Sequence, residues 1–376
     1  MPNSTLFCSA PFKSIVIDTD GSMLPCCEYK YPAPDFKSKN DFSNFDQWWT
    51  VENEVLRQDM LTDTHNEGCT YCKNKESIPG QSHLRVHHNN FHPIRNNNYT
   101  AEIERIEIRF GNYCNLKCLM CGPYASSSLG EEYLRNEDAF TNNNFKLYNV
   151  KTIRWWENPG ALDKLYSIVK NVKDIHMTGG EPMMIPEVVD ILNSIENTNV
   201  KVTFNTNMTR FTDKVFTALA RFKTVEIYAS LEGAGEHNDY IRYGSKWETV
   251  VQAVDTIKKY PNIKLSINTV LQHTSIYTLP GLIKYAQDNN IKLQFTEVYP
   301  GSGYGGSGYL TLNSAAPADV EKFKLYLTDN PNQTLESWVN TYVFDPEQHA
   351  NFRRFVGVTD KIRSVSFEKL FNPYWI

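Results

Sequence analysis

From about residue 101 onward, stretches in which apolar residues alternate with polar ones are separated by stretches with a helical repeat. The first, Glu104 to Phe110, places Ile106, Ile108 and Phe110 on one face of a strand. The same pattern predicts strands at 174–177, 201–205, 224–229, 264–271 and 292–298, and helices at 161–169, 185–195, 213–220, 247–259 and 279–289. Strands that alternate with helices predict an α/β fold with a parallel sheet and right-handed crossovers. Six strands are too few for a closed eight-stranded barrel, so a partial (βα)6 barrel is expected.

The segments on either side of this alternation have other patterns. The residues before the alternation predict a hairpin, which consists of a strand at 14–18, a turn at Asp20-Gly21 and a short return strand. A helix at 45–61 is expected after this hairpin. Residues 83–95 contain four histidines at irregular spacing, which favours a polar connector over a metal site. After the alternation, the glycine-rich residues 301–309 (GSGYGGSGY) are typical of either a lid over substrate or a surface linker. Helices are expected at 318–328 and 360–370.

The composition of the chain is typical of a folded globular protein and not of a membrane protein. With 376 residues, 41% hydrophobic and 13% aromatic, the chain can build a sizeable core. A net charge of −5 gives no general attraction to nucleic acid. No apolar run approaches the roughly 20 residues that span a bilayer, and the first residues lack the features of a signal peptide. We therefore expect a cytoplasmic protein that does not contact a membrane. The charge disfavours nucleic acid as a partner, although it leaves room for a local basic groove.

Three of the eight cysteines, Cys114, Cys118 and Cys121, lie at spacings of four and three directly after the first barrel strand. In α/β barrels this end of a strand is where functional sites are built. Three thiolates on one loop can hold three corners of an iron–sulfur cubane and leave the fourth iron open. A structural zinc site normally has four protein ligands, and no fourth ligand follows Cys121 closely, so zinc is disfavoured here.

The other five cysteines lie in the first 72 residues. Clustered cysteines in a cytosolic chain indicate metal binding or catalysis and not disulfides. The predicted hairpin brings Cys8 near Cys26, and with Cys69 and Cys72 they make a complete set of four thiolates. On spacing alone this set could hold either a closed 4Fe–4S cluster or a zinc ion.

The loop at residues 114–121 resembles the cluster-binding loop of the radical S-adenosylmethionine (SAM) superfamily, Cys-x3-Cys-x-aromatic-Cys, with Met120 at the aromatic position. The resemblance implies a 4Fe–4S cluster whose open iron chelates SAM, and an electron from the cluster that cleaves SAM to methionine and a 5′-deoxyadenosyl radical. One strand later, Gly179-Gly180-Glu181 matches the family motif that holds the methionine amino group.

The resemblance assigns further SAM contacts at later strand ends. Asn207 and Ser230 lie where the ribose is expected, and Glu232 replaces the aspartate that is more usual in this family. Arg242 closes a His-x4-Arg run and could reach the SAM carboxylate. For each of these residues, an ordinary helix cap or surface ion pair is the alternative.

The N-terminal pattern Cys8-x12-Gly21-x4-Cys26 resembles the opening of the SPASM and twitch auxiliary-cluster domains of radical SAM enzymes. The resemblance implies a second, auxiliary 4Fe–4S cluster with Cys8, Cys26, Cys69 and Cys72 as its ligands. Cys27 is then the one cysteine without an assigned cluster. Cys27 is then either a small buried residue or alternate ligand, or a catalytic hydrogen-atom donor as in radical SAM peptide epimerases.

Together these features predict three consecutive parts: an auxiliary domain at 1–98, a barrel at 99–310 and a docked helical tail at 311–376. The expected activity is radical modification of a peptide, with an electron donor such as flavodoxin or ferredoxin. Dehydrogenation or epimerisation of a small sugar-like metabolite is the alternative. A non-enzymatic iron–sulfur or zinc protein is a further alternative, but a pure electron carrier gains nothing from an open iron.

Overall fold

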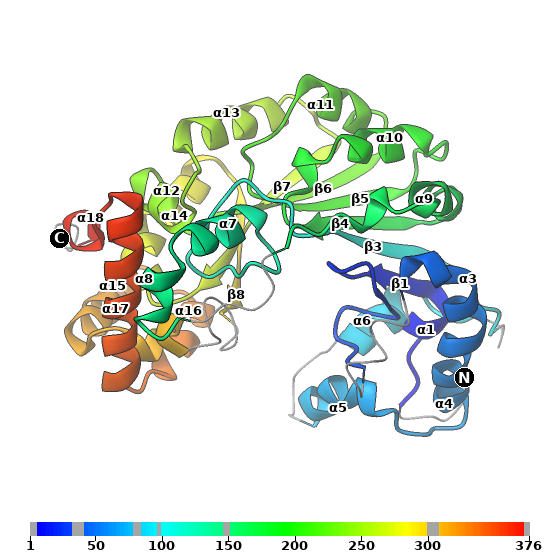
Figure 1. Ribbon diagram of the computed structural model, residues 1–376, viewed down its shortest axis with the longest axis horizontal. Coiled ribbons are helices and arrows are strands. Elements are labelled where there is room, and N and C mark those ends of the chain that lie inside the picture. Colours follow the sequence, from blue (N-terminus) through cyan, green and yellow to red (C-terminus); the bar gives the residue numbers. More distant parts are fainter. Residues whose placement is uncertain are drawn as a thin grey trace. The chain divides into compact units, whose positions relative to one another are not determined.

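The computed structural model of the chain describes residues 6–31, 41–77, 84–95, 99–145, 151–298 and 308–371 (Figure 1). Two compact units interleave along the sequence. The first comprises Met1–Gly111, Ile153–Phe204 and Asp213–Val225, and the second comprises Asn112–Thr152, Asn205–Thr212 and Glu226–Ile376. The predicted domain limits at residues 98 and 310 therefore stay a prediction, and each unit is described by itself.

The first unit is built on a mostly parallel sheet. The predicted hairpin is confirmed: β1 (Ser14–Ile17) pairs antiparallel with β2 (Met23–Leu24). The other edge of β1 pairs in parallel with β3 (Arg105–Phe110), which places Val16 opposite Glu107. β4 (Asp174–Gly179) and β5 (Lys201–Thr206) follow in parallel. The N-terminal hairpin thus extends the edge of the first barrel strand.

The two faces of this sheet differ as the alternation predicts. Ile106, Ile108 and Phe110 are completely buried on one face of β3, whereas Glu107 and Arg109 alternate with them on the other. The predicted barrel helices are confirmed as α9 (Ala161–Val169), α10 (Pro186–Ser194) and α11 (Asp213–Leu219). Trp155 and Trp156 in η4 (Trp155–Glu157) are each 3% exposed and pack against Phe110, so both belong to the core of this unit.

Most other helices of the first unit lie in the N-terminal segment. They are α1 (Ala10–Lys13), η1 (Phe42–Asn44), α3 (Phe45–Gln47), η2 (Trp48–Glu52), α4 (Asn53–Leu61), η3 (Glu67–Cys69), α5 (Thr70–Glu76) and α6 (Leu84–Phe91); the short η5 (Pro182–Met184) follows β4. The helix predicted at 45–61 is confirmed, with a π-helical turn at η2. The predicted connector at 83–95 is wrong over Leu84–Phe91, because this segment forms α6 and buries His88.

The second unit continues the alternation. Its strands are β6 (Thr224–Ser230), β7 (Ile263–Leu271) and β8 (Lys292–Glu297), neighbours in that order, and β7 pairs with β8 in parallel. Its helices before the tail are α7 (Ser127–Arg135), α8 (Glu137–Thr141), α12 (Glu236–Ile241), α13 (Trp247–Ile257) and α14 (Ser275–Asp288). The six predicted strands, now β3 to β8, and the α/β class of a partial (βα)6 barrel are confirmed.

The C-terminal tail is helical, with η6 (Gly308–Leu310), η7 (Leu312–Ser314), α15 (Pro317–Asp329), α16 (Gln333–Asn340), α17 (Pro346–Arg363) and α18 (Phe367–Phe371). The helix predicted at 360–370 is wrong, because Ser364 has a φ of 55° and ends α17. Phe352, Phe355 and Phe367 of the tail share one apolar cluster with Leu119 and Leu129. Tail helices thus pack on the cysteine loop. Most of the glycine-rich segment, 301–307, lies outside the described residues.

Among the described residues, no helix combines the length and the apolar character that crossing a membrane requires.

Candidate active site

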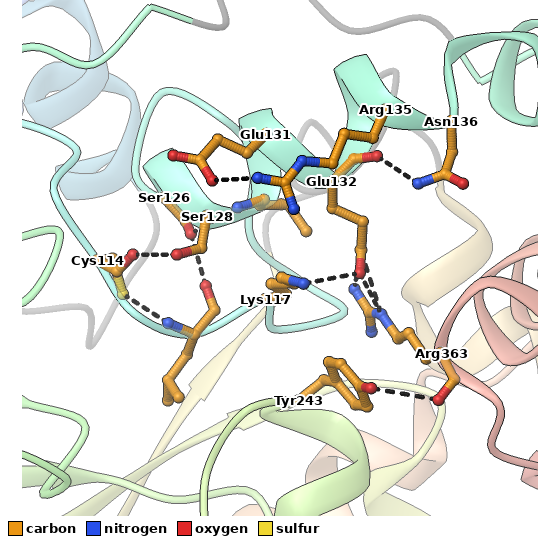
Figure 2. A network of polar contacts seen from close by, with 12 residues as sticks. Cys114, Lys117, Ser126, Ser128, Glu131, Glu132, Arg135, Asn136, Tyr243 and Arg363 are labelled. Carbon is orange, nitrogen blue, oxygen red and sulfur yellow. Dashed lines mark hydrogen bonds and ion pairs between the residues drawn. The ribbon is translucent and has the colours of Figure 1, made fainter.

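The loop that carries Cys114, Cys118 and Cys121 is tied to the start of α7 by three consecutive serines, of which Figure 2 shows Ser126 and Ser128. Ser126 caps α7 by accepting from the Leu129 N–H, and its hydroxyl donates to the Leu116 carbonyl at 2.6 Å. The Ser128 hydroxyl donates to the Cys114 carbonyl at 2.7 Å, and the Ser127 hydroxyl accepts from the Cys114 N–H at 3.3 Å. The loop is therefore fixed through its backbone, which leaves the three sulfurs for other partners.

N–H groups reach all three of these sulfurs, and the one that reaches Cys121 is the backbone N–H of Gly122. The Asn207 amide donates to Cys114 Sγ at 3.9 Å, and the Leu116 N–H donates to the same sulfur at 3.5 Å. Arg242 Nη1 donates to Cys118 Sγ at 3.7 Å. Hydrogen bonds of this kind surround the thiolate ligands of iron–sulfur clusters. The donor set of the loop therefore fits a cluster held by three thiolates.

Burial opposes ionisation of these thiols. Cys114 and Cys118 are 8% and 6% exposed. Burial raises the pKa of Cys118 although the Arg242 guanidinium acts to lower it. Burial, together with the neighbouring Cys118, raises the pKa of Cys121 to about 12. The Cys118 and Cys121 thiols are thus protonated at neutral pH, and a bound metal would displace their protons.

Arg242 is held by a buried carboxylate. Its Nη2 lies 2.5 Å from Glu232 Oε1, and Glu232, completely buried, also accepts the Val270 N–H at 2.9 Å. Burial acts to lower the pKa of Arg242, but the Glu232 carboxylate outweighs it and raises that pKa, so the guanidinium stays charged. Among the residues that the structure describes, the buried Nε of Arg242 has no hydrogen-bond partner. The structure therefore places the residue predicted to bind the SAM carboxylate directly beside Cys118.

Asn207 lies in a strained turn after β5. Its Oδ1 accepts the Thr209 N–H at 3.0 Å, and its Nδ2 donates to Asn115 Oδ1 at 3.1 Å. Met208, which follows it, has a φ of 65° and is completely buried. The structure thus places Asn207 against the cysteine loop. Ser230, the last residue of β6, is half-buried at the carboxyl end of that strand.

Gly179, Gly180 and Glu181 lie in the first unit, at the carboxyl end of β4. Gly179 has a φ of 121°, and a Cβ there would lie 2.5 Å from the Phe110 nitrogen, so no other residue fits. The Gly180 N–H donates to the Gly111 carbonyl at 3.0 Å. Glu181 is 1% exposed, and its Oε1 accepts the Met183 N–H at 3.0 Å. The predicted motif is thus rigid and adds a buried carboxylate to the strand end.

A second buried charge network supports the cysteine loop from the side of the tail (Figure 2). Glu132 of α7 is bound by Arg363 of α17, with Nη2 to Oε1 at 2.7 Å, and by Lys117 of the loop at 3.4 Å. Arg363 also stacks over the Tyr243 ring at 4.8 Å. Neither Glu132 nor Arg363 was predicted as a site residue, because 231 residues separate them.

The N-terminal thiols meet in the first unit. Cys8, Cys26, Cys69 and Cys72 line one cavity, together with Arg85 and His88 of α6. Three of the four sulfurs accept backbone N–H groups: Cys8 from Ala10, Cys26 from Glu28, and Cys72 from Arg85. The structure thus lines one cavity with the four residues predicted to hold an auxiliary cluster, and this cavity offers the four thiol donors that such a cluster takes.

Burial again governs these thiols. It raises the pKa of Cys8 and of Cys69 to about 12 and that of Cys72 to about 11, and it raises the pKa of Cys26 strongly.

Among the described residues, no three His, Cys, Asp or Glu side chains are arranged so that they could hold a metal ion.

Cys27 is separate from this set. It is not among the residues that line the four-thiol cavity. Burial, with help from Glu107, raises its pKa to about 12, and Arg109 acts in the opposite direction. Its charged neighbours thus lie on the polar face of β3. They belong to a network in which Arg109 contacts Glu107 at 2.8 Å and Asp18 at 3.0 Å.

Comparisons with known proteins cover part of the chain. The mycofactocin maturase MftC of Mycobacterium tuberculosis is 27% identical over 150 residues, 40% of this chain and 38% of that protein. The chain thus spans well under two thirds of that relative's length. The GTP 3′,8-cyclase of Clostridium perfringens is 25% identical over 279 residues, 71% of this chain and 75% of that protein. Streptococcus suis SuiB bound to SAM gives a TM-score of 0.41 at 17% identity, over 77% of this chain and 59% of that one.

Residues 108–275 match the Radical SAM superfamily. The matched part includes the three-cysteine loop, the Gly179–Glu181 motif, Asn207, Ser230 and Arg242, whereas the four N-terminal thiols precede it. This superfamily uses a 4Fe–4S cluster and SAM. The chain therefore contains a radical SAM domain at residues 108–275.

Proposed function

We propose that this protein is a radical SAM enzyme whose cluster is held by Cys114, Cys118 and Cys121. The observation that carries the proposal is the three-thiol loop itself, in which Asn207 and Arg242 donate to two of the sulfurs. When bound, the cluster and SAM supply one-electron cleavage of SAM and a 5′-deoxyadenosyl radical that abstracts a hydrogen atom from the substrate.

The chain's own residues then position SAM. We assign the Nε of Arg242 as the donor to the SAM carboxylate, since it has no partner within the described part of the chain and the other nitrogens of this guanidinium already contact Glu232 and Cys118. Glu181 is assigned to the amino group, because a buried carboxylate pairs well with an ammonium. Asn207 and Ser230 remain the candidates for the ribose.

We assign the auxiliary 4Fe–4S cluster to Cys8, Cys26, Cys69 and Cys72. Four thiolates close such a cluster, so it would transfer electrons and would not chelate SAM. Cys27 is assigned as a hydrogen-atom donor to a substrate radical, since it lies outside the four-thiol cavity and beside Glu107 and Arg109. The resulting thiyl would then need one electron and one proton, and the auxiliary cluster is the electron source that we propose.

For the substrate we propose a peptide. The match to a mycofactocin maturase, confined to 150 residues, supports a maturation reaction of this kind. A nucleotide is the second candidate, because the match to a GTP 3′,8-cyclase spans more of this chain, 279 residues. The sugar-like metabolite remains a third.

The reaction type is tested by anaerobic incubation of the reconstituted protein with SAM and dithionite. Formation of methionine and 5′-deoxyadenosine is expected, and a Cys118→Ala variant is expected to form neither. The substrate class is tested separately with SAM deuterated at the 5′ position or with deuterated substrates. Exchange of deuterium between deoxyadenosine and a peptide, but not GTP, supports the peptide; the reverse result supports the nucleotide.

The role of Cys27 is tested in the same assay with Cys27→Ala. A hydrogen-atom donor is needed only after abstraction, so this variant is expected to form deoxyadenosine and to lose incorporation of solvent deuterium into product. Unchanged product and unchanged incorporation would refute the assignment.

A further inference from the structure

A histidine that no sequence pattern connects with the N-terminal cysteines lines the four-thiol cavity of the first unit. His88 is on α6, is 3% exposed, and borders the same cavity as Cys8, Cys26, Cys69 and Cys72. Arg85, one helical turn earlier on α6, borders it too and donates its backbone N–H to Cys72 Sγ. One face of α6 is therefore directed to the thiols.

The imidazole of His88 lacks a partner on one side. Its Nδ1 is completely buried, and no hydrogen-bond partner lies within reach among the described residues. A buried polar atom without a partner costs free energy and is rare in folded proteins. The four cysteines line the same cavity as His88, so a 4Fe–4S cluster held by their thiolates would bring sulfur acceptors into that cavity.

We propose that His88 donates an Nδ1–H hydrogen bond to a sulfur of the auxiliary 4Fe–4S cluster and raises the reduction potential of that cluster. This inference rests on the auxiliary cluster proposed above. Hydrogen bonds to cluster sulfurs stabilise the reduced state, which carries more negative charge, and so raise the potential. The cluster in turn supplies the acceptor that His88 otherwise lacks.

The position of His88 on α6 offers matched variants. His88→Phe keeps an aromatic ring and removes the donor. His88→Asn retains an N–H group near the position of Nδ1 and serves as the conservative rescue. His87→Phe is the control, because His87 is the neighbouring residue on the same helix, is exposed, and does not line the cavity.

The measurement uses the full chain with Cys114, Cys118 and Cys121 all changed to Ala, so that only the auxiliary cluster contributes. After anaerobic reconstitution, iron is counted first and the midpoint potential is then determined by a redox titration followed by electron paramagnetic resonance. Exchangeable protons and nitrogens near the reduced cluster are detected by electron–nuclear double resonance.

We expect His88→Phe to keep its iron, to shift the midpoint potential to a more negative value, and to lose one exchangeable-proton coupling. His88→Asn should restore part of the shift, and His87→Phe should match the parent. An unchanged potential and proton coupling in His88→Phe would overturn the proposal. Strong nitrogen coupling in the parent, with loss of iron in His88→Phe, would overturn it in favour of a direct ligand. Absence of any cluster from the parent would instead refute the auxiliary cluster itself.

Discussion

Glu132 and Arg363 form an ion pair in which both side chains are almost completely buried, 3% and 2% exposed, with Nη2 and Oε1 2.7 Å apart. The pair joins α7, which follows the cysteine loop, to the end of α17 in the tail. Lys117, within the loop, contacts the same carboxylate. The tail therefore takes part in holding the loop that is proposed to bind the cluster.

Removing one partner of the Glu132–Arg363 pair should lower the free energy of unfolding substantially. Glu132→Ala leaves the Arg363 guanidinium buried without its counter-charge, so the free energy of unfolding should fall by about 3 to 5 kcal/mol. Urea denaturation measures the loss. Glu131→Ala is the matched control on the same helix, because the Glu131–Arg135 pair is 60% and 76% exposed and should contribute less than about 1 kcal/mol. Equal effects of the two variants would contradict the role assigned to Glu132.

The Gly179 position should tolerate no side chain. Gly179→Ala must place a Cβ 2.5 Å from the Phe110 nitrogen at a φ of 121°, so a loss of more than about 2 kcal/mol in unfolding free energy is expected. Gly281→Ala is the control. Gly281 lies inside α14 with no atom near its missing Cβ, so this change should raise stability by about 0.5 to 1 kcal/mol. A stable, fully active Gly179→Ala protein would show that the turn is not as tight as described.

Elements whose apolar residues recur with a clear period were predictable from the sequence, and elements without such a pattern were not. Strands β3 to β8 and helices such as α9 were predicted within a few residues, because their apolar positions follow one clear period. Helix α6 was missed because the residue that it buries is His88, which hydrophobicity patterns do not register. The end of α17 was misplaced because Ser364 adopts a left-handed conformation that glycine usually supplies.

The candidate site was predictable where its residues are adjacent in sequence, as in the three-cysteine loop and the Gly179–Glu181 motif. Contacts between residues that are far apart in the sequence could not be predicted. Arg242 was identified, but its contact with Cys118, 124 residues away, came only from the structure. The same holds for the pair of Glu132 with Arg363, and for His88 beside the N-terminal thiols.

Glu107 predicts a dependence of stability on pH. Burial acts to raise its pKa, but His176 and Arg109 outweigh burial and lower it from 4.5 to about 2. A lowered pKa in the folded state stabilises the protein above the unfolded pKa of about 4.5, and this contribution is lost as the pH falls toward 2. At about 1.4 kcal/mol for each pKa unit, it amounts to about 3.5 kcal/mol.

Comparison of the parent protein with Glu107→Gln tests this contribution. The difference in unfolding free energy between the two proteins should be full at pH 6 and should shrink steadily below pH 4.5. A difference that is constant from pH 6 to pH 3 would mean that the ionised carboxylate of Glu107 is not what stabilises the network.

Arg242 should affect the SAM cluster and not the auxiliary one. Arg242→Gln removes the charged donor to Cys118 and leaves Glu232 buried and unpaired, so we expect weaker SAM binding and at least a tenfold fall in deoxyadenosine formation. Iron held by the four N-terminal thiols should be unchanged. The double variant Arg242→Gln/Glu232→Gln should recover stability without recovering activity. Wild-type rates in Arg242→Gln would contradict the position assigned to this residue.

The most direct test counts iron and sulfide after anaerobic reconstitution and measures 5′-deoxyadenosine in three proteins. The parent should hold about eight irons, as two 4Fe–4S clusters require, and should form deoxyadenosine from SAM. Changing Cys114, Cys118 and Cys121 to Ala should leave about four irons and no deoxyadenosine; changing Cys8, Cys26, Cys69 and Cys72 to Ala should leave about four irons and retain its formation. A parent protein that binds zinc in place of iron and forms no deoxyadenosine would contradict the account.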